Sequence, residues 1–377
     1  MFERPEITEL AAHEHVTGEF LVTSECNMAC SYCIARELPK ATFGIEDCRK
    51  AVDLFTWLAQ GAKSAEITLT GGEPFLFVPV VEQLIQHAKA TTQANGITAT
   101  FVVKTNGTIL SKALTDFLRE HAVKVVVSID GPAGVHDRHR VTKAHAPTNS
   151  IVIRNLKTLL ECEVDCVASL TVHPDTCDEL CESVRELYGM GIEHIDVGPA
   201  YGTVTWSEKQ AGTFVESLLG IARFMRDVRL AGGRLEVGPM YRESEHVGGM
   251  LKDRWGCHAA SSNIAFMPNG QIAGCSSLAM LVTRYPDLVI GDIASGIDDD
   301  CAAHVIALSQ AAVGLRKGCQ GCDSSVNCSG GCLAINLSQN GLPFSPPPFY
   351  CRAISAIPAA WRLAWSDTDG YARASNC

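Results

Sequence analysis

Short runs rich in aliphatic and β-branched residues alternate with amphipathic stretches from about residue 18 to residue 230. Six of these runs are predicted to be strands: residues 19–23, 66–70, 98–104, 124–129, 165–171 and 194–198. Six stretches have the apolar spacing of helices: residues 46–60, 78–91, 111–121, 150–160, 176–188 and 208–230. Val, Ile, Leu and Thr dominate the strand runs, as expected of a sheet buried on both faces. The alternation therefore predicts an α/β fold.

Strict alternation of strands and helices predicts a parallel sheet with right-handed crossovers. Because there are six units rather than eight, we expect an open, partial (β/α)6 TIM-like barrel, with ligands at the carboxyl ends of its strands. After Leu230 the pattern gives way to Gly, Ser and Cys, and Ser345-Pro346-Pro347-Pro348 is interpreted as an extended spacer. The expected divisions are an N-terminal extension (1–17), the barrel (18–230), a linker (231–250), a small cysteine-rich domain (251–355) and a closing helix or tail (356–377).

Composition narrows the functional classes. The 377-residue chain is 46% hydrophobic and 19% charged, which is typical of a globular protein. Its net charge of −11 argues against nucleic acid as a partner, because phosphates would be repelled. No apolar run approaches the length of a membrane span, and the acidic N-terminus resembles no export signal, so we expect a cytoplasmic protein without a membrane partner. Seventeen cysteines in such a chain favour metal or iron–sulfur ligation over disulfides.

Three cysteines follow the first predicted strand in a C-x3-C-x2-C pattern: Cys26, Cys30 and Cys33. Three thiolates on one short loop can bind three irons of a [4Fe–4S] cluster and leave the fourth iron without a protein ligand. An open metal position distinguishes catalytic from structural sites. The pattern therefore suggests a catalytic iron–sulfur site.

Motifs also follow the next three predicted strands. Residues 71–74 read Gly-Gly-Glu-Pro, residues 105–107 read Thr-Asn-Gly, and residues 128–132 read Ser-Ile-Asp-Gly-Pro. Each motif alone is compatible with an ordinary turn or strand end. Their order, each after its own strand, instead favours one shared site at the carboxyl edge of the sheet.

Together these motifs resemble those of the radical S-adenosylmethionine (SAM) superfamily, which is marked by C-x3-C-x-aromatic-C with Tyr32 as the aromatic residue here. The resemblance implies that the Gly-Gly-Glu motif holds the methionine amino group of SAM, and that Ser128 and Arg140 contact its ribose and carboxylate. An arginine fork suits a carboxylate. The expected cofactor-binding residues are Tyr32, Gly71, Gly72, Glu73, Pro74, Asn106, Ser128, Asp130 and Arg140.

The later cysteines resemble the seven-cysteine SPASM pattern, a C-terminal extension that carries two auxiliary [4Fe–4S] clusters. The expected ligands are Cys257, Cys275 and Cys332 for the inner cluster, and Cys319, Cys322, Cys328 and Cys351 for the outer cluster. Seven thiolates leave one iron to another ligand, for which an open site is preferred over His258. Structural zinc is the alternative for this region, because C-x2-C pairs also occur in zinc ribbons.

The resemblance implies reductive cleavage of SAM to a 5′-deoxyadenosyl radical, which abstracts hydrogen from a peptide or protein side chain and yields an oxidative crosslink or related modification. An external electron donor of the flavodoxin or ferredoxin type is implied. With only 25 residues before Cys26, no leader-binding domain fits, so a separate leader-binding protein or direct recognition is expected. Alternatives are an anaerobic sulfatase-maturing enzyme, a small-molecule dehydrogenase, or a non-catalytic iron–sulfur scaffold. Ser276 stands where sulfatase maturases carry an aspartate base, and no catalytic base is named.

Overall fold

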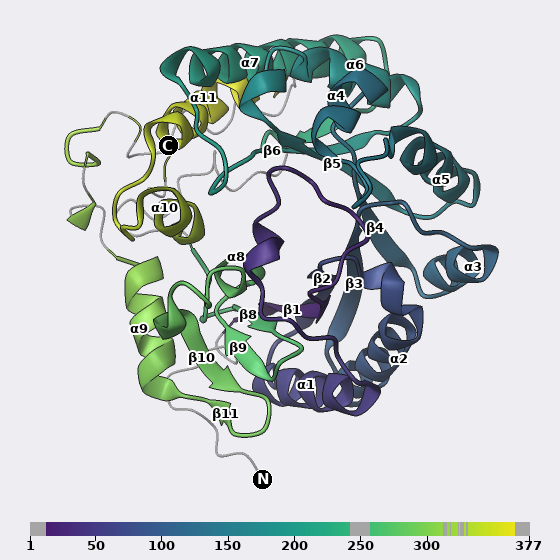
Figure 1. The fold of residues 1–377 in the computed structure, drawn as a ribbon, viewed down its shortest axis with the longest axis vertical. Coiled ribbons are helices and arrows are strands. Elements are labelled where there is room, and N and C mark those ends of the chain that lie inside the picture. The colour runs from purple at the N-terminus through teal and green to yellow at the C-terminus, as the bar shows by residue number, and fades with distance from the viewer. Residues whose placement is uncertain are drawn as a thin grey trace, which may run out of the picture.

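The structure is a computed structural model in which one curved sheet runs through the whole molecule (Figure 1). Its strand order is β11-β10-β9-β8-β1-β2-β3-β4-β5-β6-β7. The residues described are 13–241, 257–311, 315–316, 318–322, 324, 328 and 331–365. The predictions for residues 1–12, 242–256 and 366–377, which include most of the N-terminal extension and part of the linker, lie outside the described residues.

All six predicted barrel strands are confirmed, and they pair in parallel and in chain order. Their bounds are β1 His15–Thr23, β2 Ser64–Gly71, β3 Thr98–Thr105, β4 Val123–Ser128, β5 Cys166–Val172 and β6 His194–Pro199. A short seventh strand, β7 (Glu236–Gly238), pairs in parallel with β6 and was not predicted. It lies in the stretch expected to be a linker, where three residues beside a glycine-rich break carry too little pattern to reveal a strand.

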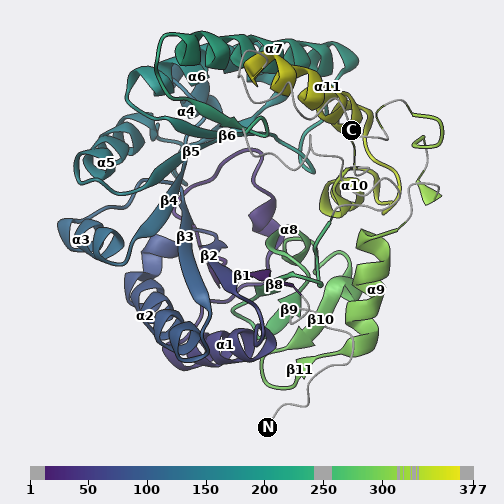
Figure 2. The same ribbon diagram turned by 180° about the vertical axis from the view of Figure 1, so that it is seen from behind.

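The predicted barrel helices form and cover the outer face of the sheet (Figures 1 and 2). Their bounds are α1 Ile45–Leu58, α2 Val78–Ala94, α3 Lys112–Glu120, α5 Asn149–Glu161, α6 Leu180–Gly189 and α7 Glu208–Leu230. The start of α7 is fixed by a capping box, in which Ser207 and Gln210 satisfy each other's backbone N–H groups. A further helix, α4 (Ala133–His139), was missed, because its seven residues are mostly polar and show no helical apolar period.

In the described part of the chain, four short 3-10 helices connect the longer elements. Three of them begin at a proline, whose fixed φ suits the first position of a helical turn. Their bounds are Ile34–Glu37, Pro74–Phe77, Pro174–Thr176 and Pro286–Leu288. The turn over Pro174–Thr176 occupies the expected start of α6, which therefore begins later than predicted.

The C-terminal region continues the barrel sheet instead of standing apart from it. Strand β8 (Asn263–Phe266) pairs in parallel with β1, with Ala265 opposite Glu19. Beyond β8 the strands are antiparallel: β9 Gln271–Ala273, β10 Val289–Asp292 and β11 Gly296–Ile297. The helices of this region are α8 Ser276–Ala279, α9 Asp299–Ser309, α10 Leu333–Asn340 and α11 Pro348–Trp365.

Helix α11 lies against α7 in both views (Figures 1 and 2), so the last helix returns to the barrel. It begins at Pro348, inside the segment predicted to be an extended spacer, and Cys351 is therefore helical. The prediction overlooked that the last proline of a series can be the first residue of a helix. Residues 356–365 of the segment expected to be a closing helix or tail belong to α11.

The core joins the barrel to the C-terminal region through aromatic side chains. Phe20 of β1 stacks on Phe266 of β8 with ring centroids 5.0 Å apart, and Phe55 of α1 meets both rings edge-on. Gly18 makes room for this packing, because a Cβ at that position would lie 2.8 Å from the Phe55 ring.

Among the described helices, none is both long and apolar enough to cross a membrane.

Candidate active site in the barrel

A cavity of about 720 Å³ lies at the carboxyl ends of the barrel strands. Its lining draws on the loop after β1 and on the ends of β2 to β7, which is where ligands of such folds bind. The predicted site residues that line it are Cys26, Cys30, Tyr32, Cys33, Gly71, Gly72, Asn106, Ser128 and Arg140. Glu73, Pro74 and Asp130 do not line it; they lie behind the wall and support it.

The three cysteines of the first motif lie on the loop after β1, each half-buried. Asn106, at the end of β3, ties this loop to the barrel: its side-chain N–H₂ donates to Asn27 Oδ1 at 2.8 Å and points at Cys26 Sγ at 3.7 Å. The backbone N–H of Met28 also donates to Cys26 Sγ, at 3.4 Å. The loop is thus held with Cys26 facing the cavity.

The thiols of this loop interact with one another electrostatically. Burial raises the pKa of Cys30 to about 11; Arg140 opposes that rise, while Cys33 and Cys26 add to it. Burial and neighbouring acidic groups also raise the pKa of Cys26. Three thiolates this close need a positive charge among them, as iron bound by thiolates supplies. The donor set therefore fits a cluster held by three cysteines.

Gly71 and Gly72 bring the second strand close to the cysteine loop. Gly71 has φ +124°, and a Cβ there would lie 2.4 Å from the carbonyl oxygen of Thr23. A Cβ on Gly72 would lie 2.0 Å from the carbonyl oxygen of Glu25. Only glycine fits at either position. Both residues line the cavity, so their backbone is open to a ligand.

The Glu73 carboxylate is fully buried and binds protein groups only. It accepts hydrogen bonds from Thr105 Oγ1 at 2.7 Å and from the N–H groups of Asn106 at 2.7 Å and Phe75 at 3.0 Å. Burial raises the pKa of Glu73, and these three hydrogen bonds oppose the rise. Glu73 thus joins the ends of β2 and β3 instead of reaching the cavity, which leaves the motif's backbone as the part that can receive an ammonium group.

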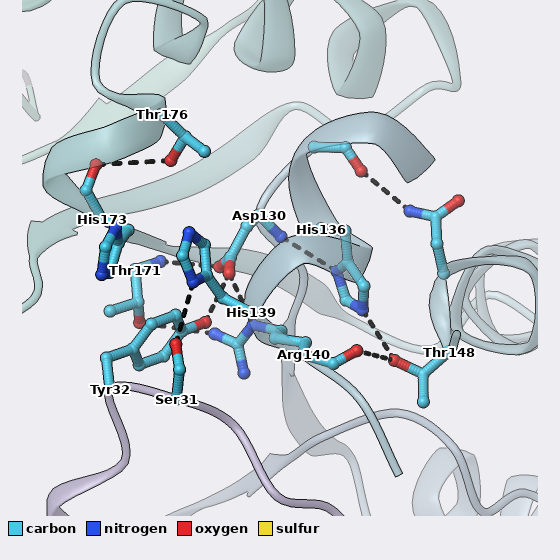
Figure 3. Close-up of polar contacts among 12 residues, drawn as sticks. Ser31, Tyr32, Asp130, His136, His139, Arg140, Thr148, Thr171, His173 and Thr176 are labelled. Atoms are coloured by element: carbon cyan, nitrogen blue, oxygen red, sulfur yellow. Dashed lines mark hydrogen bonds and ion pairs between the residues drawn. The ribbon is translucent and has the colours of Figure 1, made fainter. Parts of the chain in front are cut away.

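Asp130, which lies behind the cavity wall, forms a buried ion pair with Arg140, which lines the cavity (Figure 3). Arg140 Nε lies 2.9 Å from Asp130 Oδ2, and Tyr32 donates its phenol proton to the same oxygen. The other oxygen, Oδ1, accepts from the N–H of Thr171 at 2.9 Å. Burial alone would lower the pKa of Arg140, but the attraction of Asp130 outweighs it and raises that pKa. The guanidinium therefore stays charged at the cavity.

His136 holds the backbone that carries this ion pair. Its Nδ1 accepts from the N–H of Asp130 at 3.3 Å, and its Nε2 pairs with Thr148 Oγ1 at 3.0 Å. Thr148 Oγ1 in turn donates to the carbonyl of Arg140 at 2.6 Å. Burial, followed by the charge of Arg140, lowers the pKa of His136 to about 4. The imidazole of His136 is therefore neutral at pH 7, and it links the backbone of Asp130 to that of Arg140 through Thr148.

A second group of polar side chains lies beside the cysteine loop (Figure 3). His139, His173 and Asp175 are close enough together to suggest a cation site. The imidazole rings of His139 and His173, however, are stacked, with their centroids 3.7 Å apart and an interplanar angle of 26°. In-plane lone pairs of stacked rings do not converge on one ion. His139 Nδ1 instead pairs with Ser31 Oγ at 2.8 Å, so the stack buttresses the loop.

Two groups of cysteines form in the C-terminal region. In the inner group, Cys332 acts electrostatically on Cys257, and Cys257 and Cys332 both act on Cys275. Burial is the first cause of the raised pKa of all three thiols. Tyr201, which lines the cavity, also interacts with Cys332 and Cys275. The inner group therefore lies directly behind the cavity wall.

The outer group consists of the other four cysteines of the SPASM-like pattern. The pKa of Cys351 is raised to about 11, first by burial and then by the charges of Cys328, Cys319 and Cys322. Arg316 interacts with Cys319 and Cys328 of this group and also with Cys257 of the inner group. The seven C-terminal cysteines therefore form one group of four and one group of three.

Ser276, at the position after Cys275, is engaged by a carboxylate from the barrel. Its N–H donates to Glu19 Oε2 at 2.7 Å and its hydroxyl to Oε1 at 2.6 Å. Glu19 lies on β1, 257 positions away in sequence, and is buried. Strand β1 therefore positions the loop that carries Cys275.

The sequence motifs did not predict every residue that lines the cavity; Lys104 on β3, Asp196 on β6, Tyr201 after β6 and Tyr241 after β7 are charged or phenolic examples. None belongs to a recognisable motif. Asp196 lies between Ile195 and Val197 in a short predicted strand, and a carboxylate at that position was its one signal in the sequence.

Comparison with known proteins agrees with this geometry. Residues 20–187 match the radical SAM superfamily. The chain is 25% identical to a serine-type anaerobic sulfatase-maturating enzyme of Klebsiella aerogenes over 372 residues, covering 92% of this chain and 89% of that protein. Its fold is similar to that of anSMEcpe with bound AdoMet (TM-score 0.76, 18% identity, 93% of this chain and 98% of that one). It is also similar to Streptococcus suis SuiB bound to S-adenosylmethionine (TM-score 0.61, 14% identity, 89% and 77%). Residues 20–187 of the chain therefore form a radical SAM domain.

Proposed function

We propose that this chain cleaves SAM reductively and oxidises a side chain of a peptide or protein. The observation that carries the proposal is the cavity, which brings the three cysteines of one loop together with the backbone of Gly71 and Gly72 and the charged end of Arg140. The three thiolates suit an iron–sulfur cluster, the exposed backbone suits an ammonium group, and the guanidinium suits a carboxylate.

When bound, the [4Fe–4S] cluster and SAM supply a carbon radical that removes hydrogen from an unactivated C–H bond. Cys26, Cys30 and Cys33 would hold the cluster. The Gly71–Gly72 backbone, Ser128 and Arg140 would hold the amino group, ribose and carboxylate of SAM. The ion pair with Asp130 keeps Arg140 charged and fixed where it would meet the carboxylate of SAM.

The two C-terminal cysteine groups would hold auxiliary [4Fe–4S] clusters. Cys319, Cys322, Cys328 and Cys351 would complete the outer cluster, while Cys257, Cys275 and Cys332 would leave one iron of the inner cluster to another ligand. The inner group lies next to Tyr201 at the cavity wall. An electron released by a substrate in the cavity would therefore have a nearby acceptor, which favours a net oxidation.

A peptide or protein substrate is favoured by the relatives. Structures similar in fold include anSMEcpe with a bound Cp18Cys peptide and SuiB bound to its precursor peptide SuiA. Modification of a ribosomal precursor peptide is the first candidate. Sulfatase maturation is the second, and it is favoured by the alignment that covers 92% of this chain and 89% of a serine-type sulfatase-maturating enzyme.

We further propose a cytoplasmic site of action and an external one-electron donor of the flavodoxin or ferredoxin type. A separate leader-binding protein belongs to the precursor-peptide candidate. The net charge of −11 supports partners other than nucleic acid.

The test is anaerobic incubation of iron-loaded protein with SAM, dithionite and a serine-containing sulfatase peptide. We expect 5′-deoxyadenosine and methionine by liquid chromatography. Sulfatase maturation predicts that the peptide loses two hydrogen atoms, as read by mass spectrometry. An unchanged peptide mass would remove the sulfatase candidate. Fully iron-loaded protein that released no 5′-deoxyadenosine would contradict SAM cleavage and favour the scaffold alternative.

A further inference from the structure

The cavity contains one carboxylate among the described residues that line it, that of Asp196 on β6. Its other charged lining residues apart from the cysteines are Lys104 and Arg140, which are both cationic. The cysteine loop follows β1 and Asp196 lies five strands away along the curved sheet, so the two face one cavity from different walls. A carboxylate there can accept a hydrogen bond or a proton from a molecule in the cavity.

Asp196 is held in place by Tyr241. The phenol of Tyr241 donates to Asp196 Oδ1, which leaves Oδ2 available. Gly238 lies opposite Asp196 in the β6–β7 register. A Cβ on Gly238 would lie 2.5 Å from Asp196 Oδ1 and 2.8 Å from the Tyr241 ring, so β7 has space for this pair only because residue 238 is glycine.

Helix α11 fixes the segment that carries the phenol. Trp361 Nε1 donates to the carbonyl of Tyr241 at 2.9 Å, and Trp365 Nε1 donates to the carbonyl of Met240 at 2.9 Å. Burial and then the charge of Asp196 raise the pKa of Tyr241, so the phenol keeps its proton and acts as a donor. Preorganised groups of this kind are typical of sites that handle protons.

Asp196 is partly buried, whereas the fully buried carboxylates of the barrel are already engaged. Glu73 accepts three hydrogen bonds, and Asp130 accepts from Tyr32 and Thr171 while pairing with Arg140. Glu19 holds Ser276 with both oxygens. None of the three lines the cavity. Asp196 is therefore the barrel carboxylate placed to meet a substrate.

We propose that Asp196, positioned by Tyr241, accepts the proton of a substrate hydroxyl or thiol as the adjacent carbon is oxidised. The inference rests on the proposed function. The C–H hydrogen leaves as an atom to the radical derived from SAM, and the heteroatom proton passes to Asp196 Oδ2. The remaining electron leaves to an oxidised iron–sulfur cluster, and a carbon–oxygen or carbon–sulfur double bond forms. Asp196 thus selects side chains that carry a hydroxyl or thiol on the reacting carbon.

The test compares oxidised peptide formed per 5′-deoxyadenosine in the wild type and in variants, with the iron-loaded full chain, SAM and a synthetic serine-containing sulfatase peptide. Asp196→Asn is expected to lower this ratio about 100-fold, because a general base contributes on that order. Asp196→Glu should recover part of it. Glu236→Gln is the matched control: this carboxylate lies on the neighbouring strand β7 and does not line the cavity, so the wild-type ratio is expected.

An Asp196→Asn variant with the wild-type ratio would overturn the proposal. If the Asp196→Asn protein bound SAM more than tenfold more weakly than the wild type, Asp196 would be a SAM-binding residue. That result would also overturn the proposal. A wild type that releases 5′-deoxyadenosine but leaves the serine peptide unoxidised would contradict the hydroxyl substrate. A wild type that releases none would contradict the proposed function itself, which is a different failure.

Discussion

Replacing Cys26, Cys30 and Cys33 together with alanine is expected to reduce SAM cleavage below detection. These three thiols converge at the cavity, and no other described cysteine lines it. The two C-terminal cysteine groups do not include these three residues, so they should still bind iron. The visible absorbance of the iron–sulfur clusters should therefore decrease but remain detectable. The measurements are 5′-deoxyadenosine by chromatography, iron per chain and absorbance after anaerobic reconstitution.

The matched control replaces two half-buried cysteines outside all three groups, Cys162→Ala and Cys181→Ala. This double variant should cleave SAM at the wild-type rate with full absorbance. Cleavage that persisted in the triple variant would refute the assignment of the first cluster. Complete loss of iron would show that the three sites do not load independently.

The Asp130→Asn variant is expected to lose about 3–5 kcal/mol of unfolding free energy, because it leaves the buried Arg140 charge unpaired. The two side chains are only 6% and 8% exposed, so water screens the pair poorly. The amide also cannot receive the phenol of Tyr32 and the guanidinium as a carboxylate does. Urea unfolding followed by circular dichroism measures the loss, and weaker SAM binding should accompany it because Arg140 lines the cavity.

A surface pair supplies the comparison for this variant. Asp47 and Lys50 are both 63% exposed and lie 3.1 Å apart on α1, where such pairs contribute little. Asp47→Asn should therefore unfold at nearly the wild-type urea concentration. If Asp130→Asn did the same, the ion pair would not be what holds the cavity wall.

The barrel was predictable because its signals are local. The barrel strands are rich in Val, Ile, Leu and Thr, and each helix carries its own apolar stripe. What was missed depends on contacts between distant segments. Strand β8 has only four residues and is defined by its pairing with β1, some 245 positions earlier. Strand β7 is defined in the same way by β6.

The site was predictable as far as motifs reach. The cysteine loop, the two glycines, Asn106, Ser128 and Arg140 all line one cavity. The chemistry of Glu73 was not predictable, because whether a carboxylate faces a ligand or the protein depends on its hydrogen-bond partners. Asp196 and Tyr241 come together only when β6 and β7 pair, so no spacing in the sequence could connect them.

The most direct test of the account is electron paramagnetic resonance of the anaerobically reduced, iron-loaded protein with and without SAM. We predict that added SAM changes the signal of one cluster, because Cys26, Cys30 and Cys33 leave one iron open to the amino and carboxylate groups of SAM. The change should be absent in the triple alanine variant. Spectra that are identical with and without SAM, or metal analysis that finds zinc in place of iron, would contradict the account.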